Sequence, residues 1–80
     1  MTSKQANTLL DDMIPQAHMR VLKGYKSEGQ EFTQEKEYDF WNGVMASCAY
    51  FLRLMGFKLS NNAMYEFINT AIHRYKVRMN

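Results

Sequence analysis

The chain has 80 residues and a formal net charge of +2. This length allows a single domain with a small core, which we place at residues 1–80. Hydrophobic residues make up 46% of the chain and aromatic residues 14%, a composition that excludes intrinsic disorder as the default. The charge also lacks the strong basic excess that is typical of nucleic-acid-binding domains. So short a chain needs a dense core or a partner for stability.

The sequence favours a reducing compartment. Cys48 is the single cysteine, so the chain forms no internal disulfide and offers no cysteine cluster for a metal. The segment from Met1 to Ala6 lacks the apolar region of a secretion signal, and the longest near-apolar stretch, Val44 to Leu52, is too short to cross a bilayer. We expect a cytoplasmic protein without a membrane-spanning helix.

The first predicted helix covers residues 3–23. Its apolar residues recur at spacings of three and four, which places them on one helix face: Leu9, Leu10, Met13, Ile14, Ala17, Val21 and Leu22. Thr2 with Gln5 is typical of a capping box at its start, and Gly24 is well placed to end it. At Pro15 we expect either a kink or a restart with Asp12 as the new cap, and the kink is favoured.

The second predicted helix covers residues 34–55, after a loop at residues 25–32, with Thr33 as its N-cap. Its broad apolar face suits the central helix of a bundle and comprises Phe40, Trp41, Val44, Met45, Cys48, Phe51, Leu52, Leu54 and Met55. Gly43 and Ser47 form a shallow groove beside this face.

The second helix also carries a clear stop signal. Gly56 fits the left-handed position that follows a helix, and Phe57 could then pack on Leu52, as in a Schellman motif.

The third predicted helix covers residues 61–78. Ser60 is its expected N-cap, and Leu59 could touch Met64 as a hydrophobic staple. Apolar residues again follow helical spacing: Met64, Phe67, Ile68, Ala71, Ile72, Tyr75 and Met79. The three segments together predict an all-α fold, a compact three-helix bundle.

Two groups of charged residues are candidate binding surfaces. The basic set, Arg74, Lys76 and Arg78, lies at the C-terminal end of the third helix, where it could contact phosphates or only stabilise the negative end of the helix dipole. The acidic set comprises Glu28, Glu31, Glu35, Glu37 and Asp39, and it could face a basic partner or only stabilise the N-terminus of the second helix. Their separation along the chain suggests a dipolar molecule that would orient a charged partner.

Three tyrosines, Tyr38, Tyr50 and Tyr65, fall at the margins of the apolar faces. Each could pack on the rim of the core or serve as an aromatic anchor for a protein partner.

A DNA-reading helix-turn-helix is a weaker alternative. Asn61, Asn62 and Glu66 could read base edges from the start of the third helix, but no arginine or lysine stands there to hold phosphate.

Catalytic groups are sparse, so we expect no enzyme, no cofactor and no metal. His18 and His73 lie on different helices without a carboxylate or nucleophile at a spacing that guarantees contact. Cys48 lies on an apolar face, where a thiol is usually inert packing. His18, Cys48 and His73 lie on three different helices, so they lack the closely spaced ligand pairs that are typical of a zinc site.

The sequence therefore favours a non-catalytic protein that binds and inhibits or adapts a larger macromolecule. In type, though not in any motif, such a domain resembles the small accessory proteins with which phages inhibit host enzymes or defence complexes. A protein partner is expected. The alternative is a small DNA- or RNA-binding regulator that uses the basic C-terminal helix, and self-association is left open.

Overall fold

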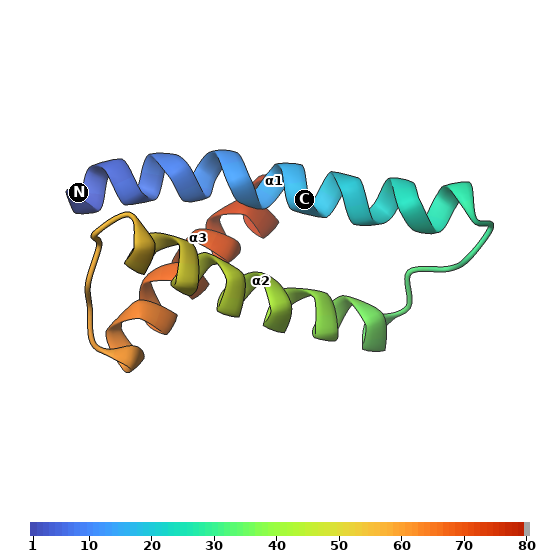
Figure 1. The fold of residues 1–80 in the computed structure, drawn as a ribbon. Coiled ribbons are helices and arrows are strands. Elements are labelled where there is room, and N and C mark those ends of the chain that lie inside the picture. Colours follow the sequence, from blue (N-terminus) through green and yellow to red (C-terminus); the bar gives the residue numbers. More distant parts are fainter. Residues whose placement is uncertain (80) are drawn as a thin grey trace.

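The computed structural model describes residues 1–79 and contains three helices, α1 (Ser3–Ser27), α2 (Gln34–Leu54) and α3 (Asn61–Met79). Each helix packs against both others, so the predicted all-α three-helix bundle is confirmed. Figure 1 shows α1 and α2 running antiparallel, while α3 crosses them and ends beside the middle of α1. The molecule is elongated along α1, with extents of 40 × 21 × 19 Å.

The three predicted N-caps are confirmed. Thr2 Oγ1 accepts the Gln5 N–H at 3.1 Å while Gln5 Oε1 accepts the Thr2 N–H at 2.9 Å, which completes the capping box of α1. Thr33 and Ser60 each accept the N–H of the third residue of their helix, both at 3.3 Å. Local sequence thus fixes where each helix begins.

The predicted Schellman motif at the end of α2 is also confirmed. Gly56 adopts a φ of +88°, and its N–H donates to the Arg53 carbonyl at 3.1 Å. The Phe57 N–H donates to the Leu52 carbonyl at 2.9 Å, and the Phe57 side chain is buried. This turn brings α3 back onto α2.

The predicted end of α1 at Gly24 is wrong, and so is the loop at residues 25–32. The helix continues to Ser27, and Gly29, with a φ of +68°, occupies the left-handed position instead. Its N–H donates to the Lys26 carbonyl at 3.1 Å, as in the turn after α2.

Side-chain contacts account for the extra turn of α1. The Tyr25 ring lies 5.1 Å from the Phe32 ring and 4.9 Å below the ammonium group of Lys36. These contacts stabilise the helical position of Tyr25, and the connecting segment is shorter than predicted.

Pro15 lies inside α1, which is one helix and does not restart at Asp12. A proline in a helix interior costs about 3 kcal/mol because it removes one backbone hydrogen bond and crowds the preceding turn. Buried Ile14 and His18 anchor α1 in the core on either side of it, which offsets that cost.

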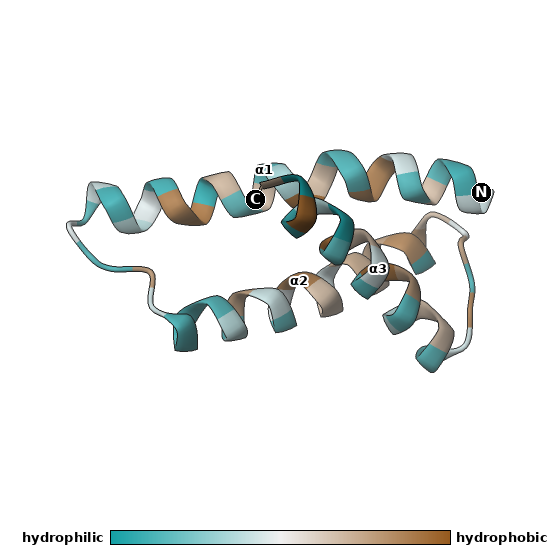
Figure 2. Cartoon of the chain, turned by 180° about the vertical axis from the view of Figure 1, so that it is seen from behind, coloured by the Kyte–Doolittle hydropathy of each residue, from teal (hydrophilic) through white to brown (hydrophobic). Residues whose placement is uncertain are grey.

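The core lies where all three helices meet. Its buried apolar side chains are Ala6, Leu10, Ile14, Trp41, Val44, Cys48, Ala49, Leu52, Phe57, Met64, Ile68, Ala71 and Ile72. Four residues assigned to apolar faces are instead exposed: Leu22, Leu54, Met55 and Met79. They lie near helix ends, and Figure 2 shows that α3 leaves the C-terminal half of α1 uncovered.

Deleting core volume should unfold this small domain, whereas the same change on the surface should not. Leu52 is fully buried and Leu54, on the same helix, is 68% exposed. We expect Leu52→Ala to lower the free energy of unfolding by about 2–5 kcal/mol and Leu54→Ala by less than about 0.5 kcal/mol. Urea unfolding followed by circular dichroism measures both, and equal losses would contradict the core assignment.

Candidate functional site

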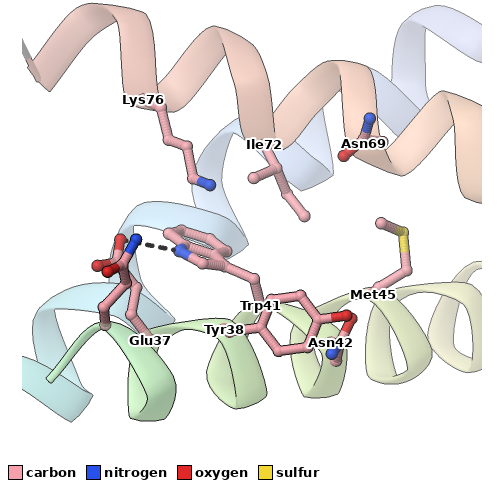
Figure 3. A pocket seen from close by; sticks show the side chains of 9 residues that line it. Glu37, Tyr38, Trp41, Asn42, Met45, Asn69, Ile72 and Lys76 are labelled. Atoms are coloured by element: carbon pink, nitrogen blue, oxygen red, sulfur yellow. Dashed lines mark hydrogen bonds between the residues drawn. The ribbon is translucent and has the colours of Figure 1, made fainter.

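A groove between α2 and α3 is the candidate site, and we call it the α2–α3 groove. It has a volume of about 370 Å³ and is open to solvent. Its lining residues are Gln34, Glu37, Tyr38, Trp41, Asn42, Met45, Asn69, Ile72 and Lys76. Figure 3 shows Trp41, Met45 and Ile72 between the facing helices, with Lys76 and Glu37 at one end.

One residue from each predicted set lines this groove. Glu37 belongs to the acidic set, Tyr38 to the aromatic anchors and Lys76 to the basic set. Glu37 and Tyr38 come from the first two turns of α2, and Lys76 comes from the last turn of α3. One carboxylate of the acidic set and one ammonium group of the basic set therefore meet at this groove.

Trp41 organises the charged end of the groove. Its Nε1–H donates to Glu37 Oε1 at 3.3 Å, and the ammonium group of Lys76 lies 4.9 Å from the centre of its ring. The indole edge is the positive part of the ring and the face the negative part, so each charge lies against the favourable region. The arrangement holds a carboxylate at the edge of one aromatic ring and an ammonium group over its face.

The other two residues of the basic set differ in their surroundings: Arg74 is bonded within the fold and Arg78 is exposed. Arg74 donates to Asp11 Oδ1 at 2.9 Å and to Asn7 Oδ1 at 3.0 Å, which ties α3 to α1. Arg78 is exposed near the end of α3. Of the three predicted phosphate-contacting cations, Arg74 is therefore engaged within the fold.

The rest of the acidic set is exposed around the connection between α1 and α2. Glu28 caps the C-terminus of α1, Glu31 lies in the connecting loop, and Glu35 is in the first turn of α2. Asp39 is exposed one turn later. Carboxylates at the start of α2 interact favourably with its helix dipole, so these residues have a structural role as well.

The three predicted anchors are exposed, Tyr38 by 69%, Tyr50 by 67% and Tyr65 by 46%. Only Tyr38 lines the α2–α3 groove. Tyr50 lies twelve residues further along α2, which places it on another side of that helix. They therefore belong to separate surfaces.

An aromatic cluster adjoins the site through Trp41. His18 is 5% exposed and packs against Trp41 and Phe40, with ring centres 5.2 and 5.8 Å away. A hydrogen bond of 2.7 Å joins His18 Nδ1 to the hydroxyl group of Tyr75. The cluster links α1, α2 and α3 through one imidazole.

The pKa of His18 lies below its ordinary value. Burial is the main cause, because it disfavours the charged imidazolium. The Glu37 carboxylate opposes this effect and the Lys76 ammonium adds to it, both as charges acting across the cluster. The folded protein therefore favours the neutral form of His18.

This shift makes folding stability sensitive to acid. The pKa of His18 in the folded state is lower than its unfolded-state value of about 6.5. The contribution of His18 to the free energy of unfolding is therefore fully present above about pH 6.5, and it is lost as the pH falls through and below that value. When the pH is lowered from about 7.5 to about 5, we expect the free energy of unfolding of His18→Phe to decrease less than that of the wild type.

Urea unfolding at the two pH values measures this difference. His73 is exposed, so His73→Phe serves as the matched control and should keep the wild-type pH dependence. The same loss in the wild type and His18→Phe would contradict the prediction.

A second groove lies between α1 and α2, and we call it the α1–α2 groove. It has a volume of about 370 Å³ and is lined by Met13, Ala17, Asp39, Phe40, Gly43, Val44, Ser47 and Cys48. The shallow groove predicted at Gly43 and Ser47 is thus confirmed. Burial raises the pKa of the Cys48 thiol, which suppresses its reactive thiolate.

Other sequence-based alternatives find little support in the geometry. Asn61, a candidate base reader, accepts a hydrogen bond from Arg53 at 2.7 Å. Within residues 1–79, no three histidine, cysteine or acidic side chains come together as metal ligands. None of the three described helices is long and apolar enough to span a membrane.

Sequence reasoning missed two features of the site. The first is the His18–Tyr75 bond, although a polar residue four positions after Ile14 on the buried stripe of α1 is a signal that a partner is needed. The second is the use of Trp41 and Met45 in the groove, since both were assigned only to packing.

Comparisons of the chain with protein-family models, curated proteins and solved structures find no match.

Proposed function

We propose that the chain is a non-catalytic protein that binds a larger protein through the α2–α3 groove and thereby inhibits or adapts it. The observation that carries this proposal is the convergence of Glu37, Tyr38 and Lys76 on one groove. Tyrosine and tryptophan are enriched at the energetic centres of protein interfaces, and charged groups at the polar rim orient the partner.

The shape of the groove supports a macromolecular partner. Tyr38 is 69% exposed and stands at the rim, so it can enter a pocket on a partner without rearrangement of the fold. The carboxamides of Asn42 and Asn69 offer both donors and acceptors to a peptide backbone from opposite helices. Glu37 and Lys76 would orient a dipolar partner surface.

A nucleic-acid partner is less well supported. Arg74 is committed to Asp11 and Asn7, and Lys76 rests on Trp41. Each phosphate contact by these side chains would compete with an interaction inside the fold. A DNA- or RNA-binding regulator remains the alternative outcome of the experiment below.

The most reactive side-chain types also favour a binding role. His18 is buried in the aromatic cluster and bonded to Tyr75, and Cys48 has a raised pKa. These environments suit packing better than proton transfer or nucleophilic attack. We therefore propose a cytoplasmic inhibitor or adaptor of the type that phages direct against host enzymes or defence complexes.

The test compares two exposed tyrosines, one inside the groove and one outside it. The partner is captured with a tagged chain from a lysate of the cells that contain the protein, with a nuclease-treated parallel, and is then purified. Tyr38→Ala should weaken binding by about 2 kcal/mol, mainly through faster dissociation, because Tyr38 is the aromatic anchor of the site. Surface plasmon resonance measures the rates.

Tyr65→Ala is the matched control, since Tyr65 is also exposed but lies outside the groove. It should bind like the wild type. Equal effects of the two substitutions would reject the groove as the binding site. Loss of capture after nuclease treatment, with tight and salt-dependent binding to purified nucleic acid, would favour the alternative function.

A further inference from the structure

The outer side of α2 carries four exposed residues that share one face of the helix: Gly43, Ser47, Tyr50 and Leu54. We call this set the outer stripe. The first two residues, Gly43 and Ser47, have small side chains. The last two, Tyr50 and Leu54, have large side chains that are 67% and 68% exposed. Gly43 and Ser47 also line the α1–α2 groove, so the small half borders an apolar depression.

We propose that two copies of this chain form a symmetric dimer in which the outer stripes of their α2 helices pack antiparallel. With the two-fold axis level with the peptide bond between Cys48 and Ala49, Gly43 of each copy lies opposite Leu54 of the other. Ser47 then lies opposite Tyr50 of the other copy. Small residues thus meet large ones at all four positions, as an isologous interface requires.

The space needed by the large residues exists in the single chain. A Cβ atom added at Gly43 would meet no atom within 4 Å, so the region above this glycine is open. Leu54 of the second copy can occupy it, and the apolar lining of Met13, Ala17 and Phe40 extends the contact toward α1. Dimerisation would remove Tyr50 and Leu54 of both copies from water, which is favourable for apolar side chains.

The charges near the ends of the stripe favour the antiparallel arrangement. Asp39 borders the α1–α2 groove, and Lys58 is exposed just after α2. An antiparallel arrangement brings the N-terminal half of α2, where Asp39 is exposed, toward the C-terminal end of α2 in the other copy, where Lys58 is exposed. A parallel arrangement would instead bring Asp39 beside Asp39 and align the two helix dipoles unfavourably.

This dimer is independent of the proposed function, because the α2–α3 groove lies on another side of α2 and shares no residue with the outer stripe. Sedimentation velocity of the full chain, from about 1 μM to about 200 μM, should show a reversible monomer–dimer equilibrium. Leu54→Asp should raise the dimer Kd at least about tenfold, since it places a carboxylate in an apolar contact.

Gly43→Leu should have a similar effect, because its side chain would fill the space that Leu54 of the second copy needs. Both substituted positions are exposed, and circular dichroism verifies that the variants fold. Tyr65→Ala lies on α3 and should leave the Kd unchanged. A wild-type chain that stays monomeric throughout the range, or a dimer that tolerates both α2 variants, would overturn the proposal.

A charge reversal tests the antiparallel arrangement directly. Asp39→Lys and Lys58→Asp should each raise the dimer Kd about three- to tenfold, since each brings like charges together at both ends of the dimer. The double variant should restore the Kd to within about twofold of the wild type, because the opposite charges meet again. Single variants without effect, or a double variant weaker than either, would overturn the antiparallel arrangement.

Discussion

The contact between His18 and Tyr75 is the constraint on which the rest of the structure depends. An imidazole that is only 5% exposed needs a hydrogen-bonding partner, and Tyr75 supplies it from α3 at 2.7 Å. The same imidazole packs against Trp41 of α2. One side chain of α1 therefore determines where the last turns of α3 lie against the first turns of α2.

That position of α3 creates the α2–α3 groove. Lys76 follows Tyr75 in the chain, and its ammonium group comes to rest over the Trp41 ring beside Glu37. The ion pair between Arg74 and Asp11 is about one-third exposed on both sides, so it contributes at most about 1 kcal/mol to stability. It ties α3 to α1 two residues before Lys76, whose ammonium group contacts Trp41.

Local signals made most of the fold predictable. Thr2, Thr33 and Ser60 were correctly identified as caps because each needs only the backbone of its own helix. The end of α1 was not predicted correctly, because Gly24 and Gly29 both satisfy the local rules for the glycine that follows a helix. Contacts of Tyr25 with a ring and a cation beyond the loop decided between them.

The candidate site was predictable only in its parts. Glu37, Tyr38 and Lys76 were identified by their chemistry, but their meeting depends on how α3 crosses α2, which no spacing within one helix encodes. α2 also presents two different surfaces, one that forms the groove with α3 and one that carries the outer stripe. A dimer through the outer stripe would carry two copies of the groove, so a partner with repeated sites would be bound with avidity that exceeds the affinity of either groove alone.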